Sequence, residues 1–294
     1  MTAPAPDGRP GVAATTPGSA PPAFRLIDIG YRYPGAEDAL AGIGFDIAAG
    51  ERVGVLGANG TGKSTLLAIM DGLIFPTSGE IAVLGTPLSE RVLRDPETNR
   101  DFRSRVGFVF QDPDAQLFSA NVYEEIAFGP LQLGLSEAEV RDRVDATIDG
   151  LGLGRIADRA PFLLSGGEKK RVALASVMAV DPDILLLDEP TTGLDPRTQV
   201  WLMEVLERMH SSGKTVVLAT HDLSFADEVV DRCIVLSEDH QMVADASTED
   251  VLSDEATLLA VNLIHEHAHS HGAAYHAHPH AHGLGHAHEH AHGE

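Results

Sequence analysis

The chain has 294 residues, of which 43% are hydrophobic and 22% charged, which is ordinary globular usage and excludes disorder throughout. Asp and Glu outnumber Lys and Arg by 44 to 21, and the formal net charge of -23 repels nucleic-acid backbones and anionic lipid head groups. We therefore expect no nucleic-acid partner, and any membrane contact should run through a protein partner. The single cysteine, Cys233, excludes an internal disulfide.

Both ends of the chain differ in composition from the part between them. Residues 1–22 contain six prolines and no apolar segment of signal-peptide length, so we expect a disordered leader. Residues 265–294 contain 12 of the 15 histidines and no Lys or Arg, which predicts a disordered His-rich tail. Residues 23–264 remain as the folded unit, and its apolar runs are far shorter than the roughly 20 residues that cross a bilayer.

The folded unit alternates strand-like and helix-like segments. In chain order we expect strands at 25–32, 44–47 and 51–56, a helix at 63–72, strands at 79–84 and 105–110, and a helical stretch at 121–164 in which Ser136 and Glu139 have capping-box spacing. A helix at 168–180, a strand at 183–188, a helix at 196–211, a strand at 215–219, a helix at 223–230 and a strand at 232–237 follow. This alternation predicts an α/β fold with a mainly parallel sheet, helices on both faces and ligands at the carboxyl ends of the strands.

A phosphate-binding loop is predicted between the third strand and the first helix, where residues 57–64 fit the pattern G-x-x-x-x-G-K-[ST]. Its glycines let backbone N–H groups converge on phosphate oxygens, and the helix start adds its positive dipole end. Lys63 would reach the β- and γ-phosphates and Ser64 would coordinate Mg²⁺. The alternative is a glycine-rich turn with an incidental lysine. We assign nucleotide binding to Gly57, Asn59, Gly60, Gly62, Lys63, Ser64 and Thr65.

A pair of acidic residues ends the predicted strand at 183–188. Four apolar residues deliver Asp188 and Glu189 to the carboxyl end of that strand. Asp188 is placed to hold Mg²⁺, directly or through water, and Glu189 to polarise a water for in-line attack on the γ-phosphorus. The alternative is an acidic pair that only caps the turn before Pro190.

A third motif narrows the class of P-loop ATPase. Residues 164–168, Leu-Ser-Gly-Gly-Glu, resemble the signature of ATP-binding-cassette (ABC) ATPases, with Ser165, Gly166 and Gly167 at its centre, and they precede the acidic strand as in that family. Ser165 and Glu168 also form a capping box, and a capped helix start is itself an anion-binding device. The resemblance covers about residues 24–252. It implies an ABC-type P-loop NTPase fold with an early antiparallel strand layer, a helical subdomain at about 121–165, and a dimer in which Ser165 approaches the ATP of the second subunit.

The resemblance also implies roles for four further residues. Gln111 matches the Q-loop glutamine, which contacts Mg²⁺ and the attacking water, and Asp195 matches the D-loop at the dimer interface. His221 matches the switch histidine that contacts the γ-phosphate. Tyr33 resembles the aromatic residue that stacks on adenine, with Tyr31 as the alternative. Glu189, His221 and Gln111 are thereby the predicted catalytic residues.

The chain departs from the usual family pattern at two positions. Ala58 stands where many members have proline, which leaves the phosphate-facing N–H groups in place. Glu168 stands where the common signature has glutamine, so an additional negative charge approaches the nucleotide. We expect Lys169 and Lys170 to offset that charge.

One segment indicates a particular branch of the family. Residues 111–118 and 124–130 resemble the stretch after the Q-loop in ATPases of energy-coupling-factor (ECF) importers, which take up vitamins, cobalt or nickel. In those machines the stretch packs against a membrane subunit. The Gly-Glu-Lys-Lys sequence at 167–170 resembles the cobalt and nickel branch.

The His-rich tail independently indicates a metal. Neutral imidazoles bind nickel, cobalt, zinc and copper, so the tail does not name the ion. Buffering, delivery or sensing of metal fits a tail on the ATPase better than a transport path does. Compositional drift and a purification tag are the alternatives. The H-x-H repeats comprise His265, His267, His269, His271, His286, His288, His290 and His292.

Taken together, the residues predict an ATP-binding and ATP-hydrolysing subunit of a membrane importer, using ATP and Mg²⁺ and energising cobalt or nickel uptake. We expect it to form a homodimer or a heterodimer with a related ATPase, and to lie on the cytoplasmic face of the membrane against an ECF-type subunit and a substrate-binding membrane component. A vitamin importer, another ABC transporter, and a metal-storage or chaperone protein are the alternatives. DNA-repair members are excluded by length, since only 53 residues separate Gln111 from Ser165.

Overall fold

The computed structural model describes residues 21–271 and 274–281, and from residue 266 onward it describes the backbone alone. The predicted leader at 1–22 therefore lies outside the described residues except for its last two. Within the described part the chain forms two sheets that share a helix, together with a two-stranded ribbon near its C-terminal end.

The smaller sheet is antiparallel and forms the early strand layer that the family resemblance implies. Its strand order is β2 (Asp38–Ile47), β1 (Phe24–Arg32), β4 (Ser78–Val83), β5 (Thr86–Pro87). The second strand begins at Asp38 and not at residue 44 as predicted. The prediction missed its first half because buried and exposed positions alternate less regularly there than at the apolar end.

The larger sheet is the predicted mainly parallel one. Its strand order is β10 (Met242–Ser247), β9 (Arg232–Leu236), β3 (Arg52–Leu56), β8 (Thr215–Thr220), β7 (Ile184–Asp188), β6 (Val106–Val109). Only β10 pairs antiparallel with its neighbour among these strands. The carboxyl ends of β3, β7 and β8 therefore lie side by side at one edge, which is where a parallel sheet binds ligands.

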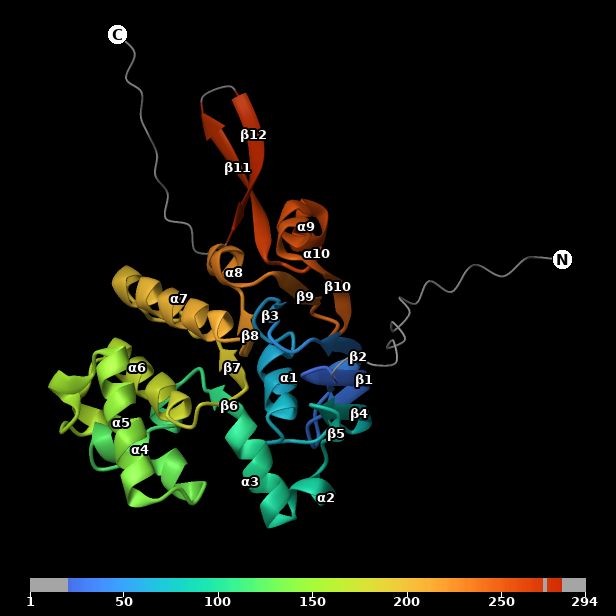
Figure 1. The fold of residues 1–294 in the computed structure, drawn as a ribbon. Helices are drawn as coiled ribbons and strands as arrows, with labels where there is room; N and C mark the ends of the chain where they lie inside the picture. Colours follow the sequence, from blue (N-terminus) through green and yellow to red (C-terminus); the bar gives the residue numbers. More distant parts are fainter. Residues whose placement is uncertain (1–20, 272–273, 282–294) are drawn as a thin grey trace, which may run out of the picture.

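Helix α1 (Lys63–Met70) lies between the two sheets (Figure 1). Because strand residues alternate between the faces of a sheet, Ile184 and Leu186 of β7 pack with α1 and the small sheet. Leu185 and Leu187 belong to the core on the other face, which is covered by helices. The helices on that side are α4 (Val122–Gln132), α5 (Glu137–Leu151), α6 (Gly166–Met178), α7 (Pro196–Ser211) and α8 (Leu223–Val229).

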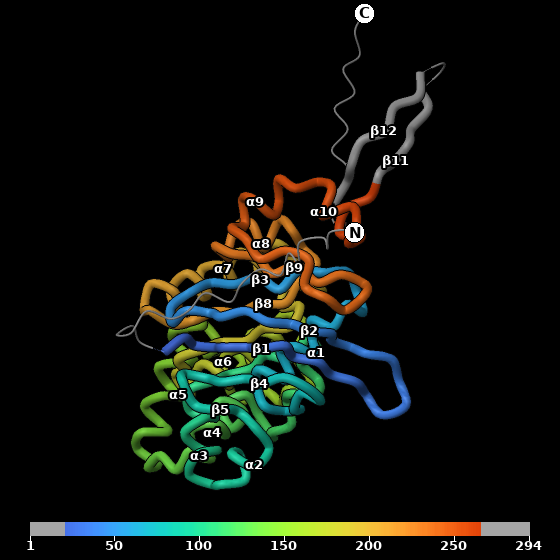
Figure 2. Tube along the Cα trace, turned by 90° about the vertical axis from the view of Figure 1, so that its right-hand side faces the viewer, coloured from blue at the N-terminus to red at the C-terminus, as the bar shows by residue number. Residues whose placement is uncertain are grey.

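Several short elements were not anticipated from the sequence. In Figures 1 and 2, α2 (Glu90–Leu93) and α3 (Pro96–Arg105) lie at one end of the molecule, and α9 (Thr248–Ser253) and α10 (Glu255–Ala260) lie at the other. Their sequences are polar and too short for a clear periodicity. The predicted capping box is confirmed, since Ser136 and Glu139 exchange both hydrogen bonds at the start of α5. Three-residue 3-10 turns at Pro113–Ala115, Gly154–Ile156 and Pro161–Leu163 complete the connections.

The first part of the predicted disordered tail differs from the structure. Residues Ile264–His271 and Ala274–Ala281 form the strands β11 and β12, which pair antiparallel. Composition indicated disorder because the segment lacks apolar side chains, but its H-x-H repeat also has the period of two that a strand requires. The rest of the tail, 282–294, lies outside the described residues.

No helix in the described part of the chain is long and apolar enough to span a bilayer.

Arg103 of α3 forms an ion pair with Asp71, whose carboxylate is buried. Nη1 of Arg103 donates to the Asp71 carboxylate at 2.7 Å and to the Asp71 backbone carbonyl at 2.8 Å, and Asp71 is 4% exposed. Burial raises the pKa of Asp71 to about 6 despite the Arg103 guanidinium beside it. The raised pKa means that this group favours the folded state most below pH 3.8, and that this contribution is lost as pH rises through about 6.

We expect Arg103→Ala to destabilise the protein by about 2–4 kcal/mol at pH 8, because the ionised Asp71 carboxylate is left buried without its cation. The loss should shrink toward pH 5, where Asp71 is protonated with or without Arg103. Urea unfolding at both pH values measures the difference. Arg105→Ala is the matched control on the same helix, because Arg105 pairs with the half-exposed Asp183 just before β7. Its loss should cost under about 1 kcal/mol. Equal losses for the two variants at pH 8 would contradict the assignment.

Candidate nucleotide-binding site

The loop between β3 and α1 has the backbone of a phosphate cradle. Gly60 and Gly62 have φ angles of 88° and 104°, a region that residues with a side chain rarely adopt. A Cβ on Gly62 would also collide with the backbone oxygen of Ala39. The conformation of the loop therefore requires glycine at these two positions. In this conformation backbone N–H groups and the start of α1 are available to an anion.

Lys63 is buried at the centre of this loop, with 5% of its surface exposed. Its Nζ donates to the carbonyl oxygens of Gly57 and Ala58 at 2.8 and 3.1 Å. It also lies 3.2 Å from Oε1 of Glu189. The Lys63 ammonium thus contacts two loop carbonyls and one carboxylate. A buried cation requires such partners.

The two acids predicted at the end of β7 lie beside the loop. Asp188 and Glu189 are 6% and 3% exposed. Burial raises the pKa of Asp188, and a hydrogen bond from Ser64 acts against that rise. Within the described part of the chain, Oδ1 of Asp188 and Oε1 of Glu189 are buried without a hydrogen-bond partner, the latter having only its ion pair with Lys63.

Those orphaned oxygens fit a divalent cation. Carboxylate and hydroxyl oxygens are the ligands that Mg²⁺ prefers, and the Ser64 hydroxyl lies against the Asp188 carboxylate. Ser64 is exposed at the start of α1, so an ion there would retain water and phosphate ligands. Ser64 and Asp188 are the residues that would hold Mg²⁺ in this site.

Glu189 is positioned by a strained backbone and by His221. Its φ angle is 43°, which costs a residue with a side chain about 1–2 kcal/mol, and its N–H donates to the Ala219 carbonyl of β8 at 2.9 Å. Its Oε2 lies 2.9 Å from Nδ1 of His221, just after β8, whose side chain is 39% exposed. The structure thus brings together Lys63, Glu189 and His221, which the sequence had assigned to one site.

The signature segment forms the start of α6. Ser165 caps the helix by accepting from the Glu168 N–H at 3.3 Å, and Glu168 accepts from the Ser165 N–H and hydroxyl at 2.8 Å each. These hydrogen bonds lower the pKa of Glu168. Ser165 and Gly166 are exposed, and Gly167 lies close to Thr198 of α7. The helix start is therefore capped and open to an external anion.

The expectation that Lys169 and Lys170 offset the charge of Glu168 is wrong. Lys169 pairs with Asp114 at 2.6 Å, and Lys170 donates to the backbone carbonyls of Glu189, Pro190 and Thr192. Residues one and two positions apart on a helix do not share a face, so these two lysines lie on other faces of α6 than Glu168. Arg159 and Arg171 are the cations whose charge acts on Glu168.

Lys170 makes contacts beside the site that sequence reasoning did not identify. By donating to the carbonyl of Glu189 and to two carbonyls that follow it, Lys170 ties the signature helix to the loop that carries the acid. Burial lowers the pKa of Lys170. The sequence signal for this contact is limited to the presence of a lysine two residues after the signature at 164–168.

The segment after β6 is fixed by a second glutamine. Gln111 is exposed and lies two residues beyond the end of β6, as expected of a residue that reaches a ligand. Gln116 accepts from the Phe110 N–H at 3.2 Å and donates to the Ala173 carbonyl of α6 at 2.8 Å. The segment is therefore tied to α6 by hydrogen bonds that the sequence did not reveal.

Asp195 and Tyr33 each have a local hydrogen-bond partner. Asp195 caps α7 by accepting from the N–H groups of Arg197 and Thr198 and from the Thr198 hydroxyl. The Tyr33 hydroxyl is 3.2 Å from Oγ1 of Thr65 on α1, and the ring is 44% exposed. An exposed aromatic face beside the phosphate loop is where an adenine could stack.

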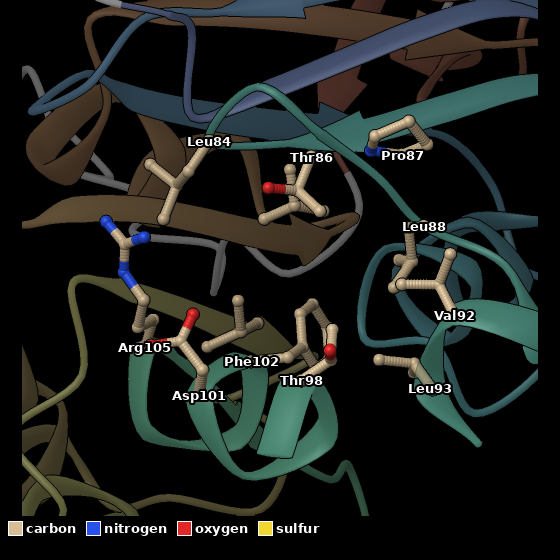
Figure 3. A pocket seen from close by; sticks show the side chains of 12 residues that line it. Leu84, Thr86, Pro87, Leu88, Val92, Leu93, Thr98, Asp101, Phe102 and Arg105 are labelled. Atoms are coloured by element: carbon tan, nitrogen blue, oxygen red, sulfur yellow. The ribbon is translucent and has the colours of Figure 1, made fainter. Parts of the chain in front are cut away.

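One pocket lies apart from this site. A small, mostly apolar pocket between β4, α2 and α3 includes Leu88, Leu93 and Phe102, and none of the predicted nucleotide-site residues lines it (Figure 3). The tail histidines at 286–292 lie outside the described residues, and those at 267–271 are described only as backbone.

The fold and the site define a P-loop ATPase cassette, and comparisons with known proteins give its family. Residues 40–192 match the ABC transporter family. The chain is 45% identical over 246 residues to the nickel import ATP-binding protein NikO of Rhodobacter capsulatus, covering 83% of this chain and 96% of that protein. It is 41% identical over 240 residues to the energy-coupling factor transporter ATP-binding protein EcfA of Methanothermobacter thermautotrophicus, covering 82% and 76%.

A solved structure agrees with these relatives. CbiO1 of Clostridium perfringens, described as part of the ABC transporter complex CbiONQ, matches with a TM-score of 0.70 at 36% identity, covering 83% of this chain and 95% of that one. The chain belongs to the ABC transporter family. It is the ATP-binding subunit of an ABC transporter, in which ATPases act as dimers with transmembrane components and couple ATP hydrolysis to transport.

We expect Glu189→Gln to bind ATP at least as tightly as the unaltered protein, because the Lys63 ammonium no longer has to leave a carboxylate. Turnover should fall roughly 100-fold or more, the usual effect of removing a general base. Equilibrium ATP binding and phosphate release measure the two quantities, and ATP-dependent dimer should accumulate on size exclusion. Glu228→Gln, on the exposed side of α8, is the matched control. Phosphate release by Glu189→Gln near the control's rate would show that Glu189 is not the base.

Proposed function

We propose that this ABC ATPase energises the uptake of nickel or cobalt ions as part of an ECF-type importer. The observation that carries the proposal is the similarity to a nickel import ATP-binding protein over 96% of that protein's length. The similarity to CbiO1 and the concentration of 12 of 15 histidines in the last 30 residues support the same cargo class.

The partner is proposed to dock at the segment after β6. Phe118 and Phe128 are 65% and 41% exposed and meet edge to face with ring centroids 4.8 Å apart. The nearby Leu131 is 51% exposed. An exposed cluster of large apolar side chains on one surface is typical of a protein contact. A membrane subunit seated there would place this chain at the cytoplasmic face of the membrane.

A buried carboxylate holds the proposed docking surface in shape. Glu125 is 3% exposed and accepts hydrogen bonds from the N–H groups of Phe118 and Ser119 at 2.9 and 2.7 Å. Gln116 ties the same loop to α6, the helix that begins at the signature. A displacement of the membrane subunit can therefore reach Ser165 through α6, and movement of Ser165 can reach the membrane subunit.

In the proposed cycle, two subunits close on ATP head to tail. Lys63 exchanges the Glu189 carboxylate for the β- and γ-phosphate oxygens, and the capped start of α6 in the opposite subunit contacts the γ-phosphate. Ser64 and Asp188 would hold Mg²⁺, with Gln111 as the further ligand that the sequence predicts, and the ion would supply positive charge against the phosphates. Glu189, released from Lys63 and oriented by His221, accepts a proton from the attacking water. Asp195 lies at the dimer interface and Tyr33 on adenine.

Hydrolysis reopens the dimer in this proposal because of differential binding. ATP bridges the two faces through its γ-phosphate, whereas ADP contacts only the loop that contains Lys63. A ligand shifts a conformational equilibrium only by its difference in affinity for the two states. Loss of the terminal phosphate therefore removes the contact that favours closure.

The test is uptake of radioactive ⁶³Ni²⁺ and ⁵⁷Co²⁺ by the native host after deletion of this gene. We expect uptake of one of the two ions to fall to background, to return with the unaltered gene or with Glu228→Gln, and not to return with Glu189→Gln. A loss of vitamin uptake with unchanged metal uptake would identify a vitamin importer. No change in either would also overturn the proposal.

A further inference from the structure

The turn between β9 and β10, residues 237–241, packs against the phosphate loop. In Figure 1, β9 lies beside β3, the strand that leads into the loop, and β10 lies near β2. The backbone N–H of Ala41 on β2 donates to the His240 carbonyl at 2.9 Å. Nδ1 of His240 lies 3.4 Å from the carbonyl oxygen of Thr61 in the phosphate loop. The turn thus joins β2 to the loop through one residue.

His240 has a backbone conformation that is costly for a residue with a side chain. Its φ angle is 59°, in the left-handed region where glycine is unstrained. Strained residues persist where surrounding contacts hold them, and they gather at functional sites. A glycine would satisfy the turn without strain, so the turn alone does not account for the imidazole.

The imidazole acts on one peptide group of the loop. A carbonyl oxygen only accepts hydrogen bonds, so Nδ1 is the protonated nitrogen in the tautomer that makes this contact. A trans peptide bond is planar, and its C=O and N–H groups point in opposite directions. The hydrogen bond to the Thr61 carbonyl therefore fixes the N–H of Gly62 on the side away from His240. Gly62 directly precedes α1, and N–H groups at a helix start have no partner within the helix.

Other carbonyls of the loop are held in the same way. The Gly57 carbonyl accepts from Lys63 Nζ at 2.8 Å, and the Ala58 carbonyl accepts from the Thr61 hydroxyl at 3.0 Å. Those donors belong to the loop and to α1, whereas His240 lies 179 residues further along the chain than Thr61. A carbonyl that accepts a hydrogen bond polarises its peptide group and strengthens the attached N–H as a donor. The loop carbonyls are thus engaged by side chains, and the N–H groups are left to an anion.

We propose that His240 is a positioning residue for nucleotide binding, whose imidazole holds the Thr61 carbonyl so that the Gly62 N–H is oriented toward a phosphate before the nucleotide binds. The part of the nucleotide concerned is the diphosphate that ATP and ADP share. His240 acts through the loop and not on the reacting atoms. The proposal is independent of the transported cargo, because it concerns the ATPase site that any cargo would use.

Three variants separate this role from a purely structural one. His240→Gly removes the imidazole and relieves the strain at φ 59°. His240→Asn keeps an N–H donor attached to the γ-carbon and tolerates the left-handed conformation. Asp239→Gly, at an exposed position of the same turn, is the matched control for introducing a glycine there. Calorimetric titration of the full chain with Mg·ADP at pH 7.5 gives the affinity without turnover, and thermal unfolding gives the stability.

We expect His240→Gly to weaken ADP binding about three- to tenfold, the usual effect of losing one hydrogen bond. His240→Asn and Asp239→Gly should stay within about twofold of the unaltered chain, because both keep a donor to Thr61. The melting temperature of His240→Gly should not fall, since glycine is unstrained at this φ angle. Its kcat at saturating ATP should stay within about twofold, because the loop binds the ground state and the transition state alike.

Unchanged ADP affinity in His240→Gly would overturn the proposal. An equal loss of affinity in His240→Asn or in Asp239→Gly would also overturn it, because the effect would then follow the shape of the turn and not the donor. A melting temperature of His240→Gly that falls together with its ADP affinity would assign His240 a structural role instead.

Discussion

The contacts of one buried ammonium organise the site. The Lys63 ammonium is nearly inaccessible to solvent, and two loop carbonyls and the Glu189 carboxylate surround it. Such partners offset the cost of burying a cation. Each of those groups is in turn held by something else: the carbonyls by the glycine conformations of the loop, and the carboxylate by a left-handed backbone and by His221. Phosphate oxygens offer Lys63 the same charge as Glu189 does, so we propose that nucleotide binding exchanges one anion for the other at Lys63 and releases the Glu189 carboxylate.

The sheet makes this arrangement possible. In a parallel sheet the carboxyl ends of neighbouring strands meet at one edge, and β3, β8 and β7 are adjacent although they are far apart in sequence. The loop after β3 carries Lys63, the end of β7 carries Asp188, and the residue after β8 is His221. Helix α6 and its Lys170 then join this edge to the signature and, through Gln116, to the exposed aromatic pair. One continuous set of contacts thus runs from the predicted nucleotide site to the surface proposed for the membrane partner.

The sequence predicted the elements whose conformation is determined by residues close together in the chain. A glycine-rich loop before a lysine, an apolar strand ending in two acids and a serine three residues before a glutamate each specify their own backbone, and each was found where expected. Contacts between distant residues could not be predicted: the pairing of Lys63 with Glu189, the hold of Lys170 on the loop after Glu189, and the Arg103 pair with buried Asp71 depend on how helices pack. The tail shows a related limit, because composition pointed to disorder while the two-residue repeat permitted strands whose register only the structure supplies.

The anion exchange at Lys63 is tested most directly by a crystal structure with Mg²⁺ and a non-hydrolysable ATP analogue. We predict that Lys63 Nζ will contact the terminal phosphates, that Glu189 will lie beyond ion-pair distance from it, and that Ser165 of a second subunit will approach the γ-phosphate. A bound nucleotide with the ion pair between Lys63 and Glu189 still closed, and its phosphates elsewhere, would contradict the account.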